Sequence, residues 1–240
     1  SNLITKNDIN QRIMNINDNY RPDLIILGHA NLLNRKSMES VKEKYNCKIL
    51  LWYEDALGKN GNGPSWSSNL KLIEKNNDLI DSYFTTTHPD EIKTSISKNK
   101  MNFLPILVDE NIENLDLFNQ KNKIKDLFFA LSHGVNFGKL KTGKVDEREK
   151  FLDDLMVKFP NINYNILGYN YEEPKWNYEY FNELSKCKVA LNLSRGKPLK
   201  YTSSNRLASL IGNGIYTFVN EKTYFNDYHC IVLKHCICWT

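Results

Sequence analysis

The sequence has no apolar run that approaches the ~20 residues a bilayer-spanning helix requires. Its start, SNLITKNDINQ, lacks the charged-then-apolar pattern of a signal peptide. The excess of positive charge is small, since 32 Lys and Arg face 28 Asp and Glu for a formal net charge of +4. So small an excess, scattered along the chain, is typical of a solvated surface and does not indicate a nucleic-acid partner. We expect a cytoplasmic protein that neither spans a membrane nor binds nucleic acid.

Cysteine is sparse, with five residues at positions 47, 187, 230, 236 and 238. Cys47 and Cys187 each precede a Lys and a strand-like apolar run, which predicts small core or strand-edge residues. The tail HCIVLKHCICWT holds the other possible zinc ligands, which are His229, Cys230, His235, Cys236 and Cys238. Their spacing fits no closed zinc site, because no second ligand pair occurs elsewhere in the chain. We therefore predict no metal, and a buried strand in the tail.

The sequence does contain an alternation of apolar strands and amphipathic helices. Its 240 residues, 41% of them apolar, suffice for one large domain or two modest ones. DLIILG, residues 23–28, is apolar without polar alternation, the pattern of a strand buried on both faces. Further strands are predicted at 47–55, 81–87 and 102–109, and helices at 5–20, 37–46, 69–78 and 88–99. This alternation predicts a parallel sheet with right-handed crossovers.

The alternation restarts after a polar stretch, 111–121, which carries few strand signals and is predicted to be a linker. The second half is predicted to contain strands at 126–132, 163–170, 188–194 and 215–221, and helices at 146–160, 178–187 and 203–214. We therefore predict an α/β protein of two Rossmann-like parallel-sheet domains, 1–110 and 122–240, that face each other across a cleft. Ligands of such sheets bind beyond the carboxyl ends of the strands.

Three loops that follow strands of the second half are unusually polar. SHGVNFGKLKTGK, residues 132–144, has glycines that let a ligand approach the backbone and lysines that can meet a negative charge. It has neither P-loop spacing nor G-x-G-x-x-G, and a structural turn would explain it equally well. In the second loop, 167–176, Tyr169 and Tyr171 could stack on a base or cap the sheet.

The third loop precedes the helix predicted at 203–214. Ser203, Ser204 and Asn205 can cap that helix by accepting hydrogen bonds from its free N–H groups. The cations nearby, which capping does not explain, are Arg195, Lys197 and Lys200. A helix N-terminus attracts anions, and cations around it make a site suited to a diphosphate. A merely solvated basic loop is the alternative.

The order of these features resembles the donor-binding region of glycosyltransferases with the GT-B fold. The matching features are a strand, SRGKP, Tyr-x-Ser-Ser-Asn-Arg, a helix, Gly-Asn-Gly, a strand and Asn-Glu-Lys-Thr. The stretch 132–149 is similar to the same group, the spore-maturation-type (CgeB-like) glycosyltransferase-like proteins with a glycosyltransferase family one-like C-terminal domain. The resemblance covers residues 120–228, and the N-terminal half matches only in its α/β rhythm.

The resemblance implies that the C-terminal domain holds a nucleotide sugar and that the N-terminal domain is the acceptor side. It implies no metal at the diphosphate, in agreement with the lack of an Asp-x-Asp in a suitable loop, and no cofactor beyond the donor substrate. Gly134 and Asn136 would face the diphosphate and sugar, and Gly168 and Tyr169 would lie beside the base. The residues that would contact phosphate or sugar are Arg195, Lys197, Ser204, Asn205 and Arg206.

The chain departs from the family pattern in two places. Many relatives have Arg-x-x-Glu, in which the Glu binds the ribose hydroxyls, whereas Ser209 stands at that position here and binds a hydroxyl more weakly. Complete members also begin with a further strand and continue well past residue 219, so the chain resembles a copy that lacks its first βα unit and its closing helices. We predict transfer of a sugar from a nucleotide diphosphate sugar to an acceptor hydroxyl of a glycan, protein or lipid. A non-catalytic nucleotide-sugar-binding module is the alternative.

An inverting transfer would need a general base in the N-terminal domain. His29 follows DLIILG at a strand's carboxyl end, and a histidine's ordinary pKa of about 6.5 suits this role. We predict His29 as the base, with Glu54 or Asp55 after ILLWY as the alternative. His29 could instead hydrogen-bond the next loop, and a retaining reaction would need no such base.

Overall fold

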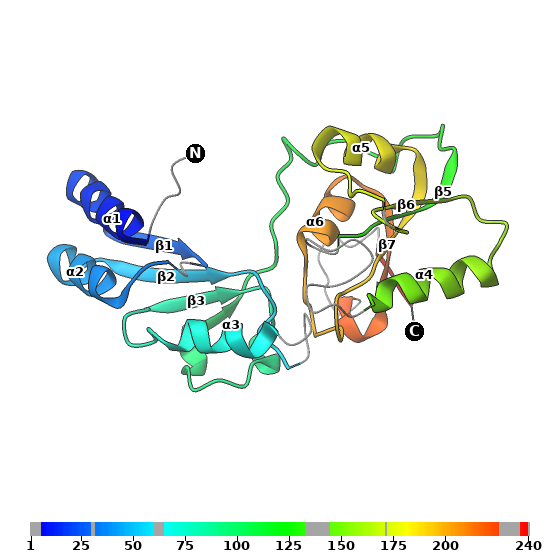
Figure 1. Ribbon diagram of the computed structural model, residues 1–240. Coiled ribbons are helices and arrows are strands. Elements are labelled where there is room, and N and C mark those ends of the chain that lie inside the picture. The colour runs from blue at the N-terminus through cyan, green and yellow to red at the C-terminus, as the bar shows by residue number, and fades with distance from the viewer. Residues whose placement is uncertain are drawn as a thin grey trace. The chain divides into compact units, whose positions relative to one another are not determined.

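The computed structural model describes residues 6–29, 32–59, 65–132, 145–170, 172–225 and 236–239. The chain forms two compact units, Ser1–Pro105 and Ile106–Thr240, each built on one sheet (Figure 1). Every strand pair among the described residues is parallel, as the alternation predicts. Residues 111–121, the predicted linker, lie within the second unit.

The first unit has a sheet in which the strands lie in chain order. Its strands are β1 (Leu24–Gly28), β2 (Lys48–Tyr53), β3 (Ser82–Thr85) and β4 (Met101–Phe103). Its helices are α1 (Lys6–Tyr20), α2 (Arg35–Tyr45) and α3 (Ser65–Glu74), with short 3₁₀ turns η1 (Pro89–Glu91) and η2 (Lys98–Lys100). Helices α1 and α2 lie side by side, and apolar residues of all three helices join one core with β1 to β4 (Figure 1).

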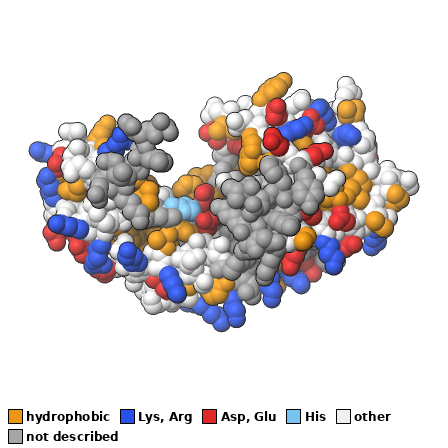
Figure 2. Space-filling model, viewed as in Figure 1, with side chains coloured by type: hydrophobic (Ala, Val, Ile, Leu, Met, Phe, Trp, Pro, Cys, Tyr) orange, Lys and Arg blue, Asp and Glu red, His pale blue; other side chains and the backbone are white. Residues whose placement is uncertain are grey.

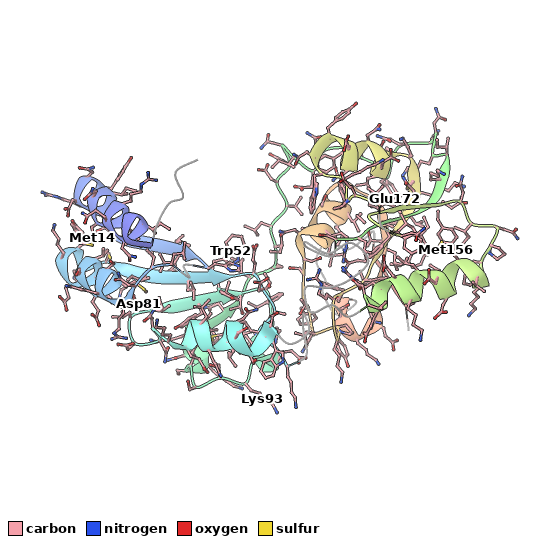
Figure 3. The ribbon with its side chains drawn as sticks, in the orientation of Figure 1. Met14, Trp52, Asp81, Lys93, Met156 and Glu172 are labelled. Carbon is pink, nitrogen blue, oxygen red and sulfur yellow. The ribbon has the colours of Figure 1, made fainter. Side chains whose placement is uncertain are left out.

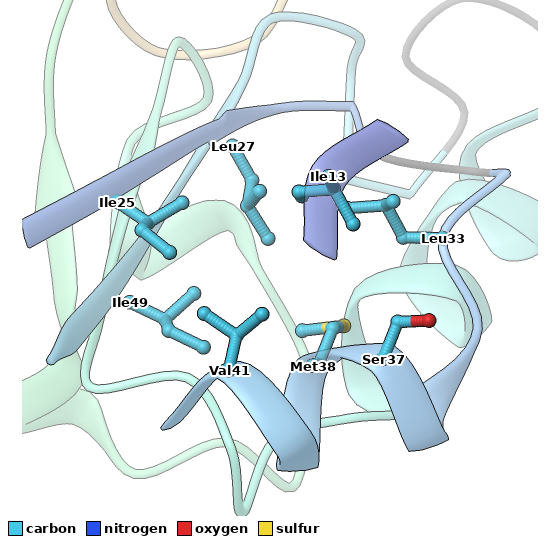
Figure 4. Close-up of a pocket in the computed structure, with 8 residues that line it drawn as sticks. All are labelled: Ile13, Ile25, Leu27, Leu33, Ser37, Met38, Val41 and Ile49. Carbon is cyan, nitrogen blue, oxygen red and sulfur yellow. The ribbon is translucent and has the colours of Figure 1, made fainter. Parts of the chain in front are cut away.

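A small apolar void of about 10 Å³ lies between α1, α2 and the first two strands (Figure 4). It is lined by Ile13, Ile25, Leu27, Leu33, Ser37, Met38, Val41 and Ile49. Space of this size holds at most one water molecule, and a lining with one hydroxyl gives water too few partners. The void is therefore a packing gap and not a ligand site.

The first strand, β1, is not buried on both faces, which corrects the sequence prediction. Leu24 and Ile26 are 49% and 64% exposed, whereas Leu27 is buried. Helices α1 and α2 cover the Leu27 side of the sheet, and β1 is an edge strand in the described sheet. An apolar run therefore occurs here on a strand with one open face.

The helix predicted at 88–99 is also wrong, because this segment forms only the turns η1 and η2. His88 Nδ1 accepts a hydrogen bond from the Asp90 N–H at 3.3 Å and so closes the first turn locally. Glu74 of α3 then accepts bonds from the Thr94 hydroxyl at 2.6 Å and the Ser95 N–H at 3.1 Å. These side-chain bonds compete with helical ones and favour an irregular path.

The second unit has the strand order β6-β5-β7-β8-β9. Its strands are β5 (Lys125–Ala130), β6 (Tyr164–Leu167), β7 (Cys187–Asn192), β8 (Tyr216–Asn220) and β9 (Cys236–Trp239), the last confirming a strand in the tail. Its helices are α4 (Glu147–Lys158), α5 (Asn177–Ser185) and α6 (Asn205–Gly212), with a 3₁₀ turn η3 (Glu221–Thr223). Because β6 and β7 pair with opposite sides of β5, the chain reverses its direction across the sheet between β5 and β7. Such a switch point is where open α/β sheets bind ligands.

The stretch 106–117 is fixed to the helix α6. The Ile106 N–H donates to Ser203 Oγ at 2.7 Å, and two later N–H groups of the stretch donate to Asn213 at 3.1 and 2.8 Å. A Cβ atom at Gly212 would come within 2.5 Å of a side chain of this stretch. Glycine therefore permits the close approach, and the stretch holds the start and the end of α6.

Burial and surface charge agree with the composition. Cys47 and Cys187 are buried at 2% and 0% exposure, as predicted. On the face in Figure 2, Lys and Arg side chains are interspersed with Asp and Glu, as expected of a solvated surface. Over the described ranges, no helix is both long and apolar enough to cross a membrane.

Candidate functional site

Three arginines gather at the carboxyl end of β5, at the switch point of the second sheet. Arg148 comes from the first turn of α4, Arg195 from the loop after β7, and Arg206 from the first turn of α6. Each donates a hydrogen bond to a backbone carbonyl, either that of Ala130 or that of Ser132. Helix α4 and the later segment from the end of β7 to the start of α6 thus bring three guanidinium groups to one strand end.

Arg206 is the most firmly held of the three. Its Nε donates to Asn192 Oδ1 at 3.1 Å, Nη1 donates to Ala130 O at 2.9 Å, and Nη2 donates to Leu193 O. The guanidinium carbon lies 4.9 Å from the centre of the Phe129 ring. Burial, with smaller contributions from the neighbouring arginines, lowers the pKa of Arg206 to about 10, so the side chain is still charged at pH 7. Arg206 therefore ties β5 to β7 and supplies positive potential, with every one of its nitrogens bonded within the protein.

Arg195 and Arg148 share one acceptor. Arg195 is exposed, and its Nη2 donates to Ser132 O at 2.9 Å. Arg148 is buried, and its Nη2 donates to the same oxygen at 3.0 Å. Its Nε also donates to Asp146 Oδ1 at 2.9 Å, and Asp146 Oδ2 accepts from Nη2. Sequence reasoning named Arg195 but missed Arg148 and Asp146, although both stand in the DERE motif at the start of a predicted helix.

The start of α6 lies next to this cluster. Ser204 Oγ caps the helix by accepting from the Leu207 N–H at 3.2 Å, which confirms the predicted capping for Ser204. Ser203 Oγ accepts from the Ile106 N–H instead, and Asn205 is the first residue of the helix. Asn205 and Lys197 are exposed. The exposed groups at this end of the sheet therefore include Arg195, Lys197 and Asn205, which sequence reasoning assigned to phosphate or sugar.

The residues predicted beside the base have structural contacts. Gly168 has φ +71°, and a Cβ there would lie 2.2 Å from Leu131 O, so glycine is required where β6 ends against β5. The Tyr169 hydroxyl donates to Asp153 of α4, and this bond raises the pKa of Tyr169 to about 12. Of the two roles considered for Tyr169, the structure shows it packed against the sheet, with its hydroxyl held by α4.

Three further residues, Ser209, Gly134 and Asn136, are predicted to bind the nucleotide-sugar donor. Ser209 lies half-buried on the second turn of α6, and its carbonyl accepts from Asn213 Nδ2 at 2.8 Å. It neighbours the hydroxyl of Tyr180, whose pKa is raised by burial. Gly134 and Asn136 lie outside the described residues.

The two alternatives for the general base are neighbours in the first unit. His29 follows β1 and Glu54 follows β2, and His29 Nε2 lies 3.6 Å from Glu54 Oε1. The His29 ring stacks on Tyr53 with 4.5 Å between ring centres, and its backbone has φ +55°, in the left-handed region. The backbone N–H of His29 donates to the carbonyl of Trp52, which lies at the carboxyl end of β2 (Figure 3). The parallel sheet therefore brings the pair together at one edge.

The acids and histidines of the described residues do not group as metal ligands. Within those ranges, no cluster of three or more His, Cys, Asp or Glu is placed to hold a metal ion. The cations at the end of β5 are guanidinium groups, a kind of side chain that can bind phosphate oxygens.

Comparison with known proteins gives a partial match and a shared fold. Residues 147–233 match a family model described as glycosyl transferase-like, a region that includes Arg148, Arg195 and Arg206 but well under half of the chain. No curated protein matches the chain. The structure of Anabaena Alr3699/HepE in complex with UDP-glucose matches with a TM-score of 0.52 and 10% identity over 96% of this chain and 68% of that one.

Two further solved structures match more weakly. The UDP complex of Anabaena Alr3699/HepE gives a TM-score of 0.48 and 10% identity over 89% of this chain and 63% of that one. The UDP-GlcNAc 2-epimerase of Neisseria meningitidis bound to UDP-GlcNAc gives 0.41 and 14% over 78% of this chain and 58% of that one. The chain thus spans about three fifths of the length of these two structures. The fold is α/β and GT-B-like, with two parallel-sheet units, and the region 147–233 is glycosyltransferase-like.

Proposed function

We propose that the protein is a glycosyltransferase that transfers a sugar from a nucleotide diphosphate sugar to an acceptor hydroxyl without a metal ion. The observation that carries this proposal is the gathering of three arginines at the switch point of the second sheet, beside the capped start of α6. Open α/β sheets bind ligands at this place, and a helix start with nearby arginines favours an anion. The glycosyl transferase-like match over 147–233 and the UDP-glucose bound by the structure of similar fold support a nucleotide sugar as that anion.

In this proposal the cations stabilise the leaving nucleotide diphosphate while the glycosidic bond breaks. Arg195 and Lys197, which are exposed, contact the diphosphate oxygens, and Asn205 at the start of α6 adds a hydrogen bond. Arg206 acts through its charge, because its nitrogens are already bonded to β5 and to the end of β7. The resemblance to the spore-maturation-type group is part of the same proposal.

Isothermal calorimetry in the presence of EDTA tests donor binding. UDP, GDP and their glucose conjugates are titrated into the wild-type protein and into Arg195→Ala, Lys197→Ala and the control Lys150→Ala, an exposed residue of α4. We expect one nucleotide to bind, with at least tenfold weaker binding to Arg195→Ala and unchanged binding to Lys150→Ala. If no nucleotide binds to the wild-type protein, the proposal fails.

For the chemical step, we propose that His29 is the general base and that Glu54 positions it. His29 Nε2 faces the Glu54 carboxylate, so Nδ1 is the nitrogen left to accept the acceptor's proton. Glu54 then stabilises the imidazolium that forms. Turnover should fall by about 10²–10⁴ in His29→Ala, the usual range for a lost general base, and by less in Glu54→Gln, with donor binding unchanged in both. Full turnover in His29→Ala alongside a dead Glu54→Gln would reverse the assignment.

A non-catalytic nucleotide-sugar-binding module is the second candidate, favoured by Ser209 at the position where relatives carry a ribose-binding Glu. It predicts the same calorimetric binding with neither sugar transfer nor donor hydrolysis. The variant Ser209→Glu tests this candidate further. If the wild-type protein binds the donor without hydrolysing it, and Ser209→Glu binds the donor more tightly and hydrolyses it, the serine at this position accounts for the missing activity.

A further inference from the structure

Arg148 is a buried cation whose presence neither its helix nor ordinary stability explains. It stands in the first turn of α4, where the helix dipole disfavours positive charge. Arg148 and Asp146 are only 7% and 2% exposed. A buried ion pair is on average no better for stability than apolar residues of the same volume. The pair therefore calls for a role that depends on geometry.

The geometry of Arg148 centres on one carbonyl oxygen. A carbonyl oxygen has two lone pairs, and Ser132 O accepts from Arg148 Nη2 at 3.0 Å and from Arg195 Nη2 at 2.9 Å. Both guanidinium groups therefore meet at one atom just past β5. Asp146 accepts from Arg148 on both of its oxygens, and it also caps α4 by accepting from the Arg148 N–H at 3.0 Å.

Asp146 also limits the charge of the cluster. Its carboxylate pairs with Arg148, so its negative charge offsets part of the effect of this third guanidinium on Arg206. Arg148 can thus hold the strand end without adding a full positive charge beside two other arginines. Being buried and bonded on Nε and Nη2, it is a poor candidate for direct contact with a ligand.

We propose that Arg148 is a positioning residue for the donor site, an inference that rests on the proposed function. It fixes the Ser132 carbonyl, and that carbonyl fixes the place from which Arg195 meets the donor's phosphate oxygens. Arg148 therefore acts on the ligand only through Arg195. Asp146 holds the Arg148 guanidinium in the required orientation.

A double-mutant cycle on UDP affinity tests this dependence, because a merely structural residue would weaken binding with or without Arg195. Calorimetry is done on the full chain as wild type, Arg148→Met, Arg195→Met and the double variant. We expect Arg148→Met to weaken UDP binding about tenfold in the wild-type background and less than twofold in the Arg195→Met background. Lys158→Met, at the exposed other end of α4, is the matched control and should leave affinity unchanged.

Asp146→Asn provides a second variant in case Arg148→Met fails to fold. Asn is as good a helix cap as Asp, so α4 keeps its start while the ion pair is lost. Its effect on UDP affinity should likewise disappear in the Arg195→Met background. Equal weakening in both backgrounds, or no weakening in either, would overturn the role of Arg148 while leaving the proposed function intact. A wild-type protein that binds neither UDP, GDP nor their glucose conjugates would overturn both.

Discussion

Replacing Arg206 by Met should destabilise the second unit by about 3–5 kcal/mol. The substitution keeps most of the aliphatic stem but leaves three acceptors without their donor: Asn192 Oδ1, Ala130 O and Leu193 O. Each unsatisfied buried acceptor costs about 1–3 kcal/mol, and relief of the buried charge offsets part of the sum. The loss is a large fraction of the 5–15 kcal/mol by which domains are usually stable.

Native-state hydrogen exchange with mass spectrometry at increasing urea resolves this loss unit by unit. Peptides covering β5 and β7 should lose protection in Arg206→Met, whereas those covering β2 should not, because β2 belongs to the other unit. The control is Arg195→Met, an exposed arginine of the same cluster, which should cost less than about 1 kcal/mol. If β5 and β7 keep wild-type protection in Arg206→Met, the guanidinium bonds do not hold the strand ends and the description of Arg206 is wrong.

Three further predictions concern packing, pH and thiol chemistry. Gly212→Ala should destabilise the second unit by about 1–3 kcal/mol through overpacking against the stretch 106–117, whereas Gly28→Ala, which has open space around its Cβ, should be nearly neutral in the same urea titration. Partial burial opposes ionisation of Asp81, but hydrogen bonds from Lys42 and a backbone N–H outweigh it and lower the pKa of Asp81 below its ordinary 3.8. Its carboxylate therefore stabilises the first unit above pH 4 and loses that effect as the pH falls through the folded-state pKa. In Asp81→Asn, the hydrogen-exchange protection of the first unit should fall less steeply with decreasing pH than in the wild-type protein, and an unchanged dependence on pH would contradict this. Burial raises the pKa of Cys187 to about 11. With the other four cysteines, Cys47, Cys230, Cys236 and Cys238, replaced by Ser, Cys187 should therefore react with a thiol reagent only after unfolding, and fast labelling of the native protein would refute its burial.

The α/β rhythm could be predicted from the sequence because it depends on local patterns. Apolar runs, helix starts such as Ser204 and helix ends such as Gly212 can be recognised from residues that are neighbours in the sequence. The structure has parallel strands at the apolar runs and a capped helix α6 between Ser204 and Gly212. The exposure of Ile26 on β1 could not be predicted. It depends on which strands and helices flank β1, and an apolar run alone cannot show that one face stays open.

The position of the candidate site could be predicted from the sequence, but the hydrogen-bond partners of its arginines could not. The sequence puts Arg195 and Arg206 near the start of one helix, and the strand order then brings that helix start to the switch point. Whether an arginine points outward or ties strands together depends on acceptors far away in sequence, such as Ala130 for Arg206. For the same reason the role of Arg148 could not be predicted, because its acceptor Ser132 precedes it by 16 residues in the sequence.

The first unit shows the same limit in another form. His29 and Glu54 were alternatives in the sequence because each follows a different strand. The parallel pairing of β1 with β2 places their side chains 3.6 Å apart, so one proposal can use both. Sequence patterns identified the strand ends, and pairing across the sheet supplied the contact.

The central claim is that the arginine cluster of the second unit binds the diphosphate of a nucleotide sugar. ³¹P NMR of UDP-glucose or GDP-glucose, whichever the protein binds in calorimetry, tests it most directly when recorded in EDTA with and without the protein. We predict that both phosphorus resonances shift or broaden with the wild-type protein and remain at their free positions with Arg195→Ala at the same concentration. Resonances that are unchanged by the wild-type protein, or changed equally by Arg195→Ala, would contradict the claim.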